Sequence, residues 1–239
     1  MIGEMPQRRG MFITFEGSDG SGKSTQAGRL AAKLRDLGHE VVETREPGGS
    51  PRAEAIRALL LSGKAARYGA FAETMLFNAA RADHLRSMIR PALARGAIVI
   101  CDRFADSTRA YQGVLGKVSD ELLEAAEEAV VADTAPDLTI ILDLPAAETL
   151  ERLGTRRVSG GTRDRFEEEA LAHHAALRQA FLDIAARSRE RCVVIDARRS
   201  IEEAAKRILN VVITRLGPDD PRAGEQREKK GDGRNQKRR

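Results

Sequence analysis

Tryptophan is absent from this chain of 239 residues, aromatic side chains make up only 4% of it, and it has two cysteines. Cys101 and Cys192 both lie in short apolar runs, where a thiol packs as a small hydrophobic group, so we expect neither a disulfide nor a cysteine-based metal site. No apolar run reaches the roughly 18 residues that a membrane-spanning helix needs. The first ten residues lack the apolar stretch of a signal peptide. We therefore expect a cytoplasmic protein with no membrane partner.

The excess positive charge is concentrated at the carboxyl end. The formal net charge is +4, and residues 218–239 contain eight Lys or Arg against five Asp or Glu. Neither this segment nor residues 1–10 have apolar periodicity, so we expect 1–10 to be a disordered extension and 218–239 to be a disordered basic tail. We expect the basic tail to be solvated and not to contact nucleic acid.

Strand-like and helix-like segments alternate between these ends. Apolar runs predict strands near 11–16, 40–44, 97–101, 138–143 and 192–196. Amphipathic patterns predict helices over 23–37, 51–62, 69–94, 119–132, 146–155, 165–188 and 200–215, with Pro91 ending or kinking the third. This alternation is typical of one α/β domain, a parallel sheet with helices on both faces, whose ligands lie beyond the carboxyl ends of the strands.

A glycine-rich turn follows the first predicted strand. Its sequence, EGSDGSGKSTQ at 16–26, contains G-x-x-x-x-G-K-[ST] between a strand and a helix. In such a loop the backbone N–H groups and the helix N-terminus face phosphate oxygens. Lys23 then reaches the β- and γ-phosphates of ATP, and Ser24 offers its hydroxyl to Mg²⁺. The predicted ATP-binding residues are Gly17, Ser18, Asp19, Gly20, Ser21, Gly22, Lys23, Ser24 and Thr25.

The use of the bound nucleotide follows from what accompanies the loop. A regulatory GTPase would need an N/T-K-x-D motif to read its base, and the chain has none. A large motor ATPase would need a longer chain. Transfer of the γ-phosphoryl group to a small acceptor remains, and it requires an acceptor site facing the loop and a lid that excludes water.

Two pairs of residues suit an acceptor site. Phe77 and Arg81 lie four residues apart on one helix face, where a ring can stack on a base and a guanidinium can bond its carbonyl, although a core Phe beside a surface Arg would give the same spacing. Asp102 and Arg103 end an apolar strand. There a carboxylate reaches a magnesium-bound water and a guanidinium clamps a phosphate.

Five segments in order closely resemble the thymidylate kinases, which phosphorylate dTMP to dTDP with ATP. They are the loop at 16–26, TREPGG at 44–49, LFNAAR at 76–81, DRFADSTRAYQG at 102–113 and RDRFEEE at 163–169. The resemblance runs from about 11 to 215 and is to the bacterial type with lid arginines. It implies a P-loop nucleoside monophosphate kinase fold with strand order 2-3-1-4-5, a homodimer, Mg²⁺ with ATP, and a role in dTTP synthesis.

The resemblance also implies roles for the acceptor-site residues. Phe77 and Arg81 match the residues that hold thymine, and Arg103 matches the arginine that binds the acceptor phosphate during transfer. Asp19 accepts a hydrogen bond from the acceptor 3′-hydroxyl or helps to place Mg²⁺. By the same resemblance, dTMP-binding residues include Arg45, Ser107, Thr108, Tyr111 and Gln112, with Tyr111 lying where a ribose hydroxyl would clash. Phe104 stands where the family more often has Tyr.

A lid is predicted at about 154–165. Some family members carry an arginine beside the acid of the phosphate loop, where this chain has Gly20, so another segment must supply cations. The connection at 152–169 contains Arg156, Arg157, Arg163 and Arg165, and Asp164 with Glu167 predicts a capping box for the next helix. We expect Arg156 or Arg165 to be catalytic, together with Lys23, Arg103 and Asp19.

Two other functions stay open from the residues. One is a kinase of the same fold that acts on another nucleoside monophosphate. The other is a nucleotide-dependent nucleic-acid-binding protein that uses the basic tail.

Overall fold

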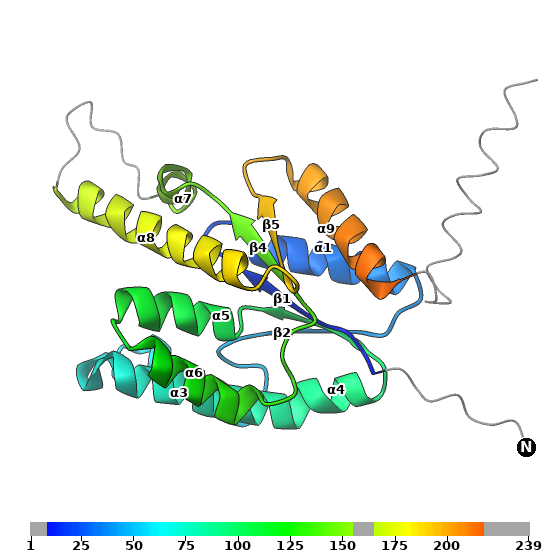
Figure 1. The fold of residues 1–239 in the computed structure, drawn as a ribbon, viewed down its shortest axis with the longest axis horizontal. Coiled ribbons are helices and arrows are strands. Elements are labelled where there is room, and N and C mark those ends of the chain that lie inside the picture. The colour runs from blue at the N-terminus through cyan, green and yellow to red at the C-terminus, as the bar shows by residue number, and fades with distance from the viewer. Residues whose placement is uncertain (1–8, 155–164, 218–239) are drawn as a thin grey trace, which may run out of the picture.

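Five parallel strands form the centre of the molecule, which is described here from a computed structural model over residues 9–154 and 165–217, with the side chains of 165–168 left out. The strands are β1 (Phe12–Glu16), β2 (Val41–Arg45), β3 (Ile98–Asp102), β4 (Leu138–Asp143) and β5 (Cys192–Asp196). Their order is β2-β3-β1-β4-β5, and every neighbouring pair is parallel (Figure 1). The predicted fold class and strand order are therefore confirmed.

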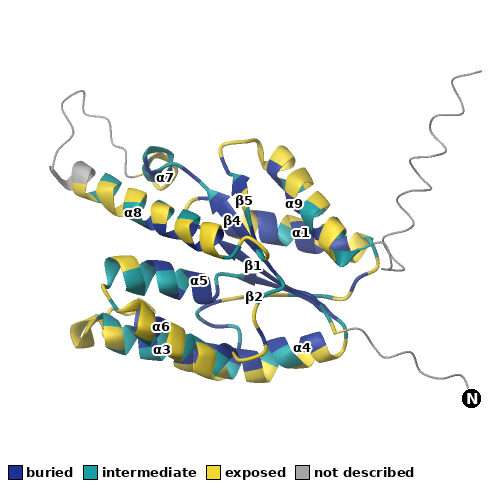
Figure 2. Cartoon of the chain, in the orientation of Figure 1, coloured by how far each residue is buried: buried dark blue, intermediate teal, exposed yellow. Residues whose placement is uncertain are grey.

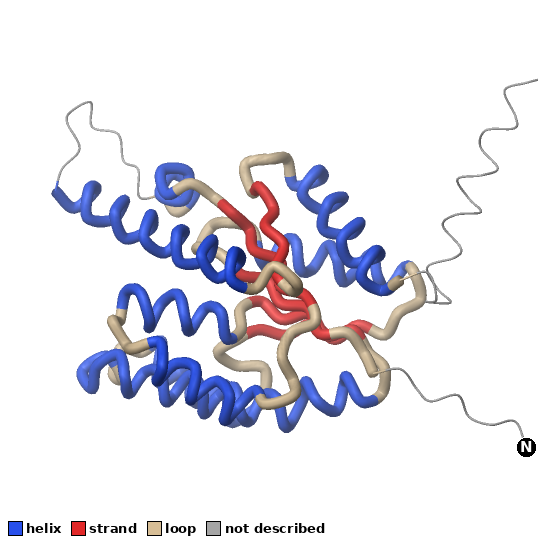
Figure 3. The backbone as a smooth tube through the Cα atoms, viewed as in Figure 1, coloured by secondary structure: helices blue, strands red, loops and turns tan. Residues whose placement is uncertain are grey.

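Helices cover both faces of the sheet (Figure 1). The helices α1 (Lys23–Asp36) and α9 (Ile201–Leu216) pack on one face. The segment from α3 (Gly69–His84) through η2 (Leu85–Ile89) to α4 (Arg90–Ala94), and α8 (Arg165–Arg187), contribute to the apolar clusters of the other face. The remaining helical segments are α2 (Pro51–Leu61), η1 (Ala66–Tyr68), α5 (Ala105–Thr108), η3 (Arg109–Leu115), α6 (Asp120–Val131) and α7 (Ala146–Arg152). Loops join them to the strands (Figure 3).

The core follows from the two-residue period of the strands. Phe12 packs with η2 and α4, whereas Ile13 and Phe15 pack with α1 and α9 on the opposite face. The central strands β1, β3 and β4 are buried on both faces, as expected for a parallel sheet between two helix layers, whereas the edge strands β2 and β5 are partly exposed (Figure 2). Cys101 and Cys192 are buried and free, as predicted. Among the described residues, no helix is long and apolar enough to cross a bilayer.

Two local features differ from the sequence-based prediction. The helix predicted over 69–94 is interrupted by the π-helical turn η2, and Pro91 lies in the first turn of α4, because proline has no N–H to donate to the preceding turn. A capping box is formed by Ser200 and Glu203 at the start of α9. Its S-x-x-E spacing is visible in the sequence but was not predicted.

Several predicted features lie outside the described residues. These are the two extensions (1–8 and 218–239 are not described) and the lid segment 155–164 with Arg156, Arg157, Arg163 and Asp164. The side chains of Arg165 and Glu167 are likewise not described. The lid and its capping box therefore stay predictions.

Candidate active site

The phosphate loop joins the buried strand β1 to α1 through glycines in conformations that other residues rarely adopt. Gly17 has φ 129°, and a Cβ built there would lie 2.5 Å from Leu142 O. Gly22 caps α1 with φ 94°. The first turn of α1 has no acidic residue and no side-chain cap from Gly22. Its N–H groups and the positive end of its dipole therefore suit an anion.

Lys23 lies buried inside this loop. Its Nζ donates to Gly17 O at 3.1 Å and to Ser18 O at 2.8 Å. Burial, with the nearby charge of Arg103, lowers the pKa of Lys23 to about 8. A buried ammonium group in a ring of carbonyls and N–H groups is a point charge well placed for phosphate.

Ser24 and Asp102 meet at the start of α1 and the end of β3. Ser24 Oγ donates to Asp102 Oδ2, and Asp102 Oδ1 is buried without a hydrogen-bond partner among the described residues. Hydroxyl and carboxylate oxygens are the ligands that Mg²⁺ prefers. This pair therefore fits the predicted metal site, with an acceptor atom left to face a cation or its water.

Arg103 follows β3 in a left-handed backbone conformation, with φ 70°. Its guanidinium donates to Asp19 Oδ1 at 2.6 Å, to Ser107 Oγ at 3.0 Å and to Gly17 O at 3.3 Å, and it stacks 5.2 Å from the centre of the Tyr111 ring. Although partial burial alone would raise the pKa of Asp19, the charges of Arg103 and Lys23 lower it. Asp19 is therefore held as a carboxylate beside two cations.

Glu16, the last residue of β1, is completely buried beneath this turn. It accepts hydrogen bonds from Phe104 N at 2.7 Å and from Ser107 Oγ at 2.6 Å. Burial, with the charge of Asp106, raises the pKa of Glu16 to about 7, against the opposing effect of the Ser107 hydrogen bond. No role was predicted for Glu16, although it begins the quoted phosphate-loop segment.

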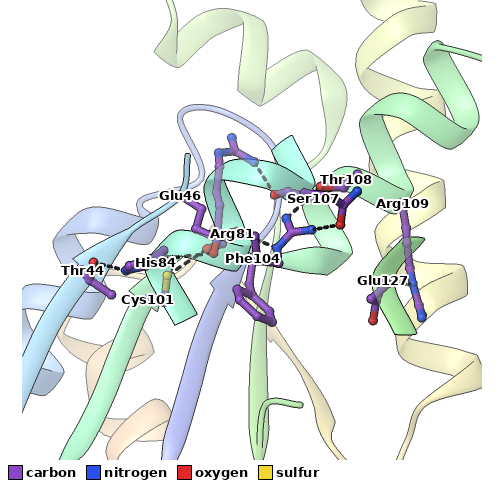
Figure 4. Close-up of polar contacts among 12 residues, drawn as sticks. Thr44, Glu46, Arg81, His84, Cys101, Phe104, Ser107, Thr108, Arg109 and Glu127 are labelled. Atoms are coloured by element: carbon purple, nitrogen blue, oxygen red, sulfur yellow. Dashed lines mark hydrogen bonds and ion pairs between the residues drawn. The ribbon is translucent and has the colours of Figure 1, made fainter. Parts of the chain in front are cut away.

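A second buried network surrounds Arg81 (Figure 4). Arg81 donates to Glu46 Oε2 at 2.8 Å, to Asn78 Oδ1 at 3.2 Å and to Thr108 Oγ1 at 2.9 Å. Glu46 Oε1 also lies 3.1 Å from His84 Nδ1. Glu46 is part of the quoted TREPGG segment, but neither it nor His84 was predicted to contribute. A buried arginine needs a buried acid to balance its charge. No pattern in the sequence indicates which acid forms that pair.

One cavity of about 660 Å³ connects the phosphate loop with the Arg81 network. It is lined by both pairs on which the acceptor site was predicted, Phe77 with Arg81 and Asp102 with Arg103. The predicted residues along it are Asp19, Gly20, Gly22, Lys23, Ser24, Thr25, Arg45, Phe77, Arg81, Asp102, Arg103, Ser107, Thr108, Tyr111 and Gln112. Glu46, Arg57 and Leu61 also line it, without having been predicted.

Three predicted residues have further partners. Arg45 forms an ion pair with Glu54 at 3.1 Å. Ser18 is buried, with its hydroxyl 3.4 Å from Thr149 Oγ1. The hydroxyl of Ser107 bonds Glu16 and Arg103. At the position where the family more often has Tyr, the ring of Phe104 packs edge-on against Phe12 with centroids 5.0 Å apart.

A smaller cavity of about 330 Å³ lies beside the phosphate loop. It shares Gly22 and Thr25 with the larger one. Arg152 lines it and donates to Gly20 O at 3.3 Å and to Ala197 O at 2.8 Å. The other lining residues are Ser21, Gln26, Leu142, Arg199, Ile201 and Ala204, together with Ala197 itself. The phosphate loop thus borders two cavities.

The fold, the phosphate loop and the two cavities define a nucleoside monophosphate kinase of the P-loop class. The family model described as thymidylate kinase matches residues 15–208. The chain belongs to the thymidylate kinase family.

Individual relatives agree with this assignment. A thymidylate kinase of Caulobacter vibrioides is 53% identical over 209 residues, which cover 87% of this chain and 99% of the relative. One from Rhodopseudomonas palustris is 55% identical and covers 87% of this chain and 90% of the relative. The crystal structure of thymidylate kinase from Ehrlichia chaffeensis superposes with a TM-score of 0.68 at 35% identity, covering 85% of this chain and 98% of that one.

Proposed function

We propose that this dTMP kinase binds dTMP in the larger cavity and ATP along the phosphate loop, and that it serves dTTP synthesis in the cytoplasm. The observation that carries the proposal is the continuous cavity from Lys23 to Arg81. Its phosphate end is cationic, and its far end presents N–H donors beside the ring of Phe77. A nucleoside monophosphate is complementary to this cavity. Its phosphate dianion suits the cationic end, and its flat base suits the end with Phe77 and the N–H donors.

Arg81 selects thymine over cytosine through the N–H groups that do not bond other protein residues. A guanidinium has five N–H groups and no acceptor. Three of these bond Glu46, Asn78 and Thr108, so two remain for the ligand. They bond the carbonyl of thymine, whereas the amino group of cytosine would meet donors only. Phe77 stacks on the base, and Thr108 and Gln112 line its edge.

Tyr111 selects the sugar. Its hydroxyl accepts from Arg103 at 3.3 Å, and its ring packs against Phe181 of α8 with centroids 6.5 Å apart. A ring held from two sides does not move away from a 2′-hydroxyl, so ribonucleotides are rejected. Asp19 accepts a hydrogen bond from the 3′-hydroxyl or orients the hydrated metal ion, and Arg45 borders the acceptor phosphate.

Phosphoryl transfer is promoted mainly by positioning and by cations. Lys23 binds the β- and γ-phosphates of ATP, Arg103 binds the phosphate of dTMP, and Arg156 or Arg165 of the lid closes over the transferring group. The acceptor phosphate is already ionised at neutral pH, so no general base is required.

Ser24 would bind Mg²⁺ and Asp102 would hold one of its waters, and the bound ion would supply positive charge to the ATP phosphates. The free Oδ1 of Asp102 supports this assignment. The smaller cavity, with Arg152 and Arg199, takes the adenine end of ATP on the other side of the loop. The remaining ATP contacts come from the loop residues 17–25.

The homodimer is also part of the proposal. Leu59 of α2, Tyr68 of η1 and Phe71 of α3 are exposed apolar side chains on neighbouring helical segments. A second copy would cover them. Light scattering should give the mass of a dimer for the parent chain and a lower mass for Phe71→Glu; a monomeric parent would overturn this part.

The substrate is tested by measuring ADP release with each common nucleoside monophosphate in turn. We expect a strong preference for dTMP. Preference for AMP, CMP or GMP would favour another kinase of the same fold. ATP turnover without any acceptor, with salt-sensitive DNA binding that disappears on truncation after Gly217, would favour the nucleic-acid-binding alternative.

A further inference from the structure

We propose that Glu16 is a positioning residue for Arg103. Its carboxylate holds the turn of residues 103–107, so that the guanidinium is fixed at the phosphate loop. This inference rests on the role proposed above for Arg103. Glu16 is fully buried and does not line either cavity, so its effect on the reaction is exerted through other residues.

The turn needs to be held because its backbone is unfavourable. Arg103 has φ 70°, and a residue with a Cβ keeps that conformation only where its surroundings impose it. Two consecutive amides are tied to the end of β1: Arg103 N donates to Phe15 O at 2.9 Å, and Phe104 N donates to Glu16 Oε1 at 2.7 Å. Glu16 thus fixes the peptide that immediately follows the strained residue.

The same carboxylate acts on the side chain of Arg103 through Ser107. The Ser107 hydroxyl donates to Glu16 Oε2 at 2.6 Å and accepts from Arg103 Nη1 at 3.0 Å. A hydroxyl has one proton, and because Glu16 takes it, the lone pairs of Ser107 are left for the guanidinium. Ser107 N also donates to Glu16 Oε1 at 3.3 Å, which fixes the first turn of α5.

The arrangement is that of the ionised form of Glu16, which predominates above its raised pKa of about 7, so the kinetic test below is made at about pH 8. All three of its hydrogen-bond partners are donors, as an ionised carboxylate requires. A glutamine would turn its amide N–H groups toward one of them. Only a carboxylate offers an acceptor oxygen to every one of these donors, although burying an acid is costly.

The test is a double-mutant cycle. Glu16→Gln, Arg103→Ala and the double variant are compared by kcat and by KM for each substrate. We expect Glu16→Gln to lower kcat by about tenfold or more in the parent, with KM for ATP within about twofold, and to cause less than about a twofold further loss in the Arg103→Ala background. The effects of mutations on kcat are non-additive in this way when the mutated residues act together.

The matched control is Asp137→Asn. Asp137 also accepts a hydrogen bond from a backbone N–H of β1, from Phe12 at 2.7 Å, but at the amino end of the strand. Its replacement should lower the melting temperature and leave kcat within about twofold of the parent. A loss of kcat in this control equal to that in Glu16→Gln would show a general effect of stability and overturn the proposal.

Two other outcomes separate the hypotheses. If Arg103→Ala keeps its activity, the role of Arg103 is wrong. If Arg103→Ala is inactive while Glu16→Gln retains more than about half of kcat, or if the two losses are additive, only the role of Glu16 is wrong. Should Glu16→Gln fail to fold, Glu16→Asp enters the same cycle, because the shorter side chain keeps the charge but draws the carboxylate away from Phe104 N and Ser107 Oγ.

Discussion

Arg103 Nη2 donates to Asp19 Oδ1 over 2.6 Å, which joins the turn after β3 to the phosphate loop. The arginine side chain is 18% exposed and the aspartate 61%. A pair with one exposed partner contributes little to stability, about 1 kcal/mol or less. Its importance is therefore in orientation, because both groups border the place where the two phosphates meet.

Asp19→Asn should lower kcat for dTMP by about tenfold or more while the melting temperature changes by only a few degrees. The amide keeps the shape of the side chain but loses the charge that orients Arg103. Steady-state kinetics and thermal unfolding measure the two effects. Glu202→Gln, which removes the exposed ion pair between Glu202 of α9 and Arg29 of α1, is the control and should change neither kcat nor the melting temperature.

Lys23→Ala should abolish nearly all phosphoryl transfer and leave the fold intact. The substitution removes two hydrogen bonds from Lys23 to the loop carbonyls of Gly17 and Ser18, but it also removes the cost of burying a charge, so the net loss of stability should be small. The coupled assay and circular dichroism test the two parts. Lys33→Ala, on the same helix and paired only with Asp36 at 3.8 Å, should have full activity. Normal turnover in a folded Lys23→Ala variant would contradict the role of the loop.

Arg81→Lys should raise KM for dTMP by about tenfold or more and reduce the preference for dTMP over dCMP, because the donors of a lysine share one nitrogen and cannot replace the planar fork that reaches Glu46, Asn78, Thr108 and the base. Competition between dTMP and dCMP gives the selectivity directly. Arg109→Lys is the matched control. It changes an arginine paired with Glu127 at 2.8 Å in the same region (Figure 4), outside the lining of the cavity.

Stability should depend on pH through Glu16. Its pKa is raised from 4.5 to about 7, so the folded chain holds a proton that the unfolded chain releases. The resulting stabilisation is present below about pH 4.5 and is lost as pH rises through about 7. The groups that act on Glu16 are Asp106, Arg103 and Ser107.

Glu16→Gln removes this titration and is the variant that tests it. Its melting temperature relative to the parent should therefore increase between pH 5 and pH 8, even though its turnover falls. Thermal unfolding of both proteins across about this pH range decides the point. A constant difference at all pH values would mean that Glu16 does not titrate there.

The lid arginines give a further prediction. At least one of Arg156, Arg157, Arg163 and Arg165, with Arg156 and Arg165 as the leading candidates, should lower kcat by about 10³-fold when changed to alanine. Replacing an exposed arginine elsewhere on the surface with alanine should leave kcat almost unchanged. The four variants serve as controls for one another at saturating ATP. Retention of more than about a third of kcat by every variant would contradict the lid.

Much of the molecule was determined by local patterns. The apolar runs predicted all five strands within one residue, because strands packed between helix layers are rich in apolar residues, although the edge strand β2 ends in Glu43, Thr44 and Arg45. The phosphate loop was equally visible, since its positive φ angles require glycine at fixed spacing. The acceptor residues were recognised only as a set that resembles a family, because Phe77 or Arg81 alone has an ordinary structural explanation.

Tertiary structure decided which partner each of these residues meets. Glu16 bonds Ser107 across 91 positions of the sequence, and Glu46 bonds Arg81 across 35. No periodicity in the chain records such pairs, because strand order brings the carboxyl ends of β1, β2 and β3 side by side independently of their distance along the sequence. The sequence alone therefore determined which residues carry chemistry, and the parallel sheet decided which buried acids hold the two arginines in place.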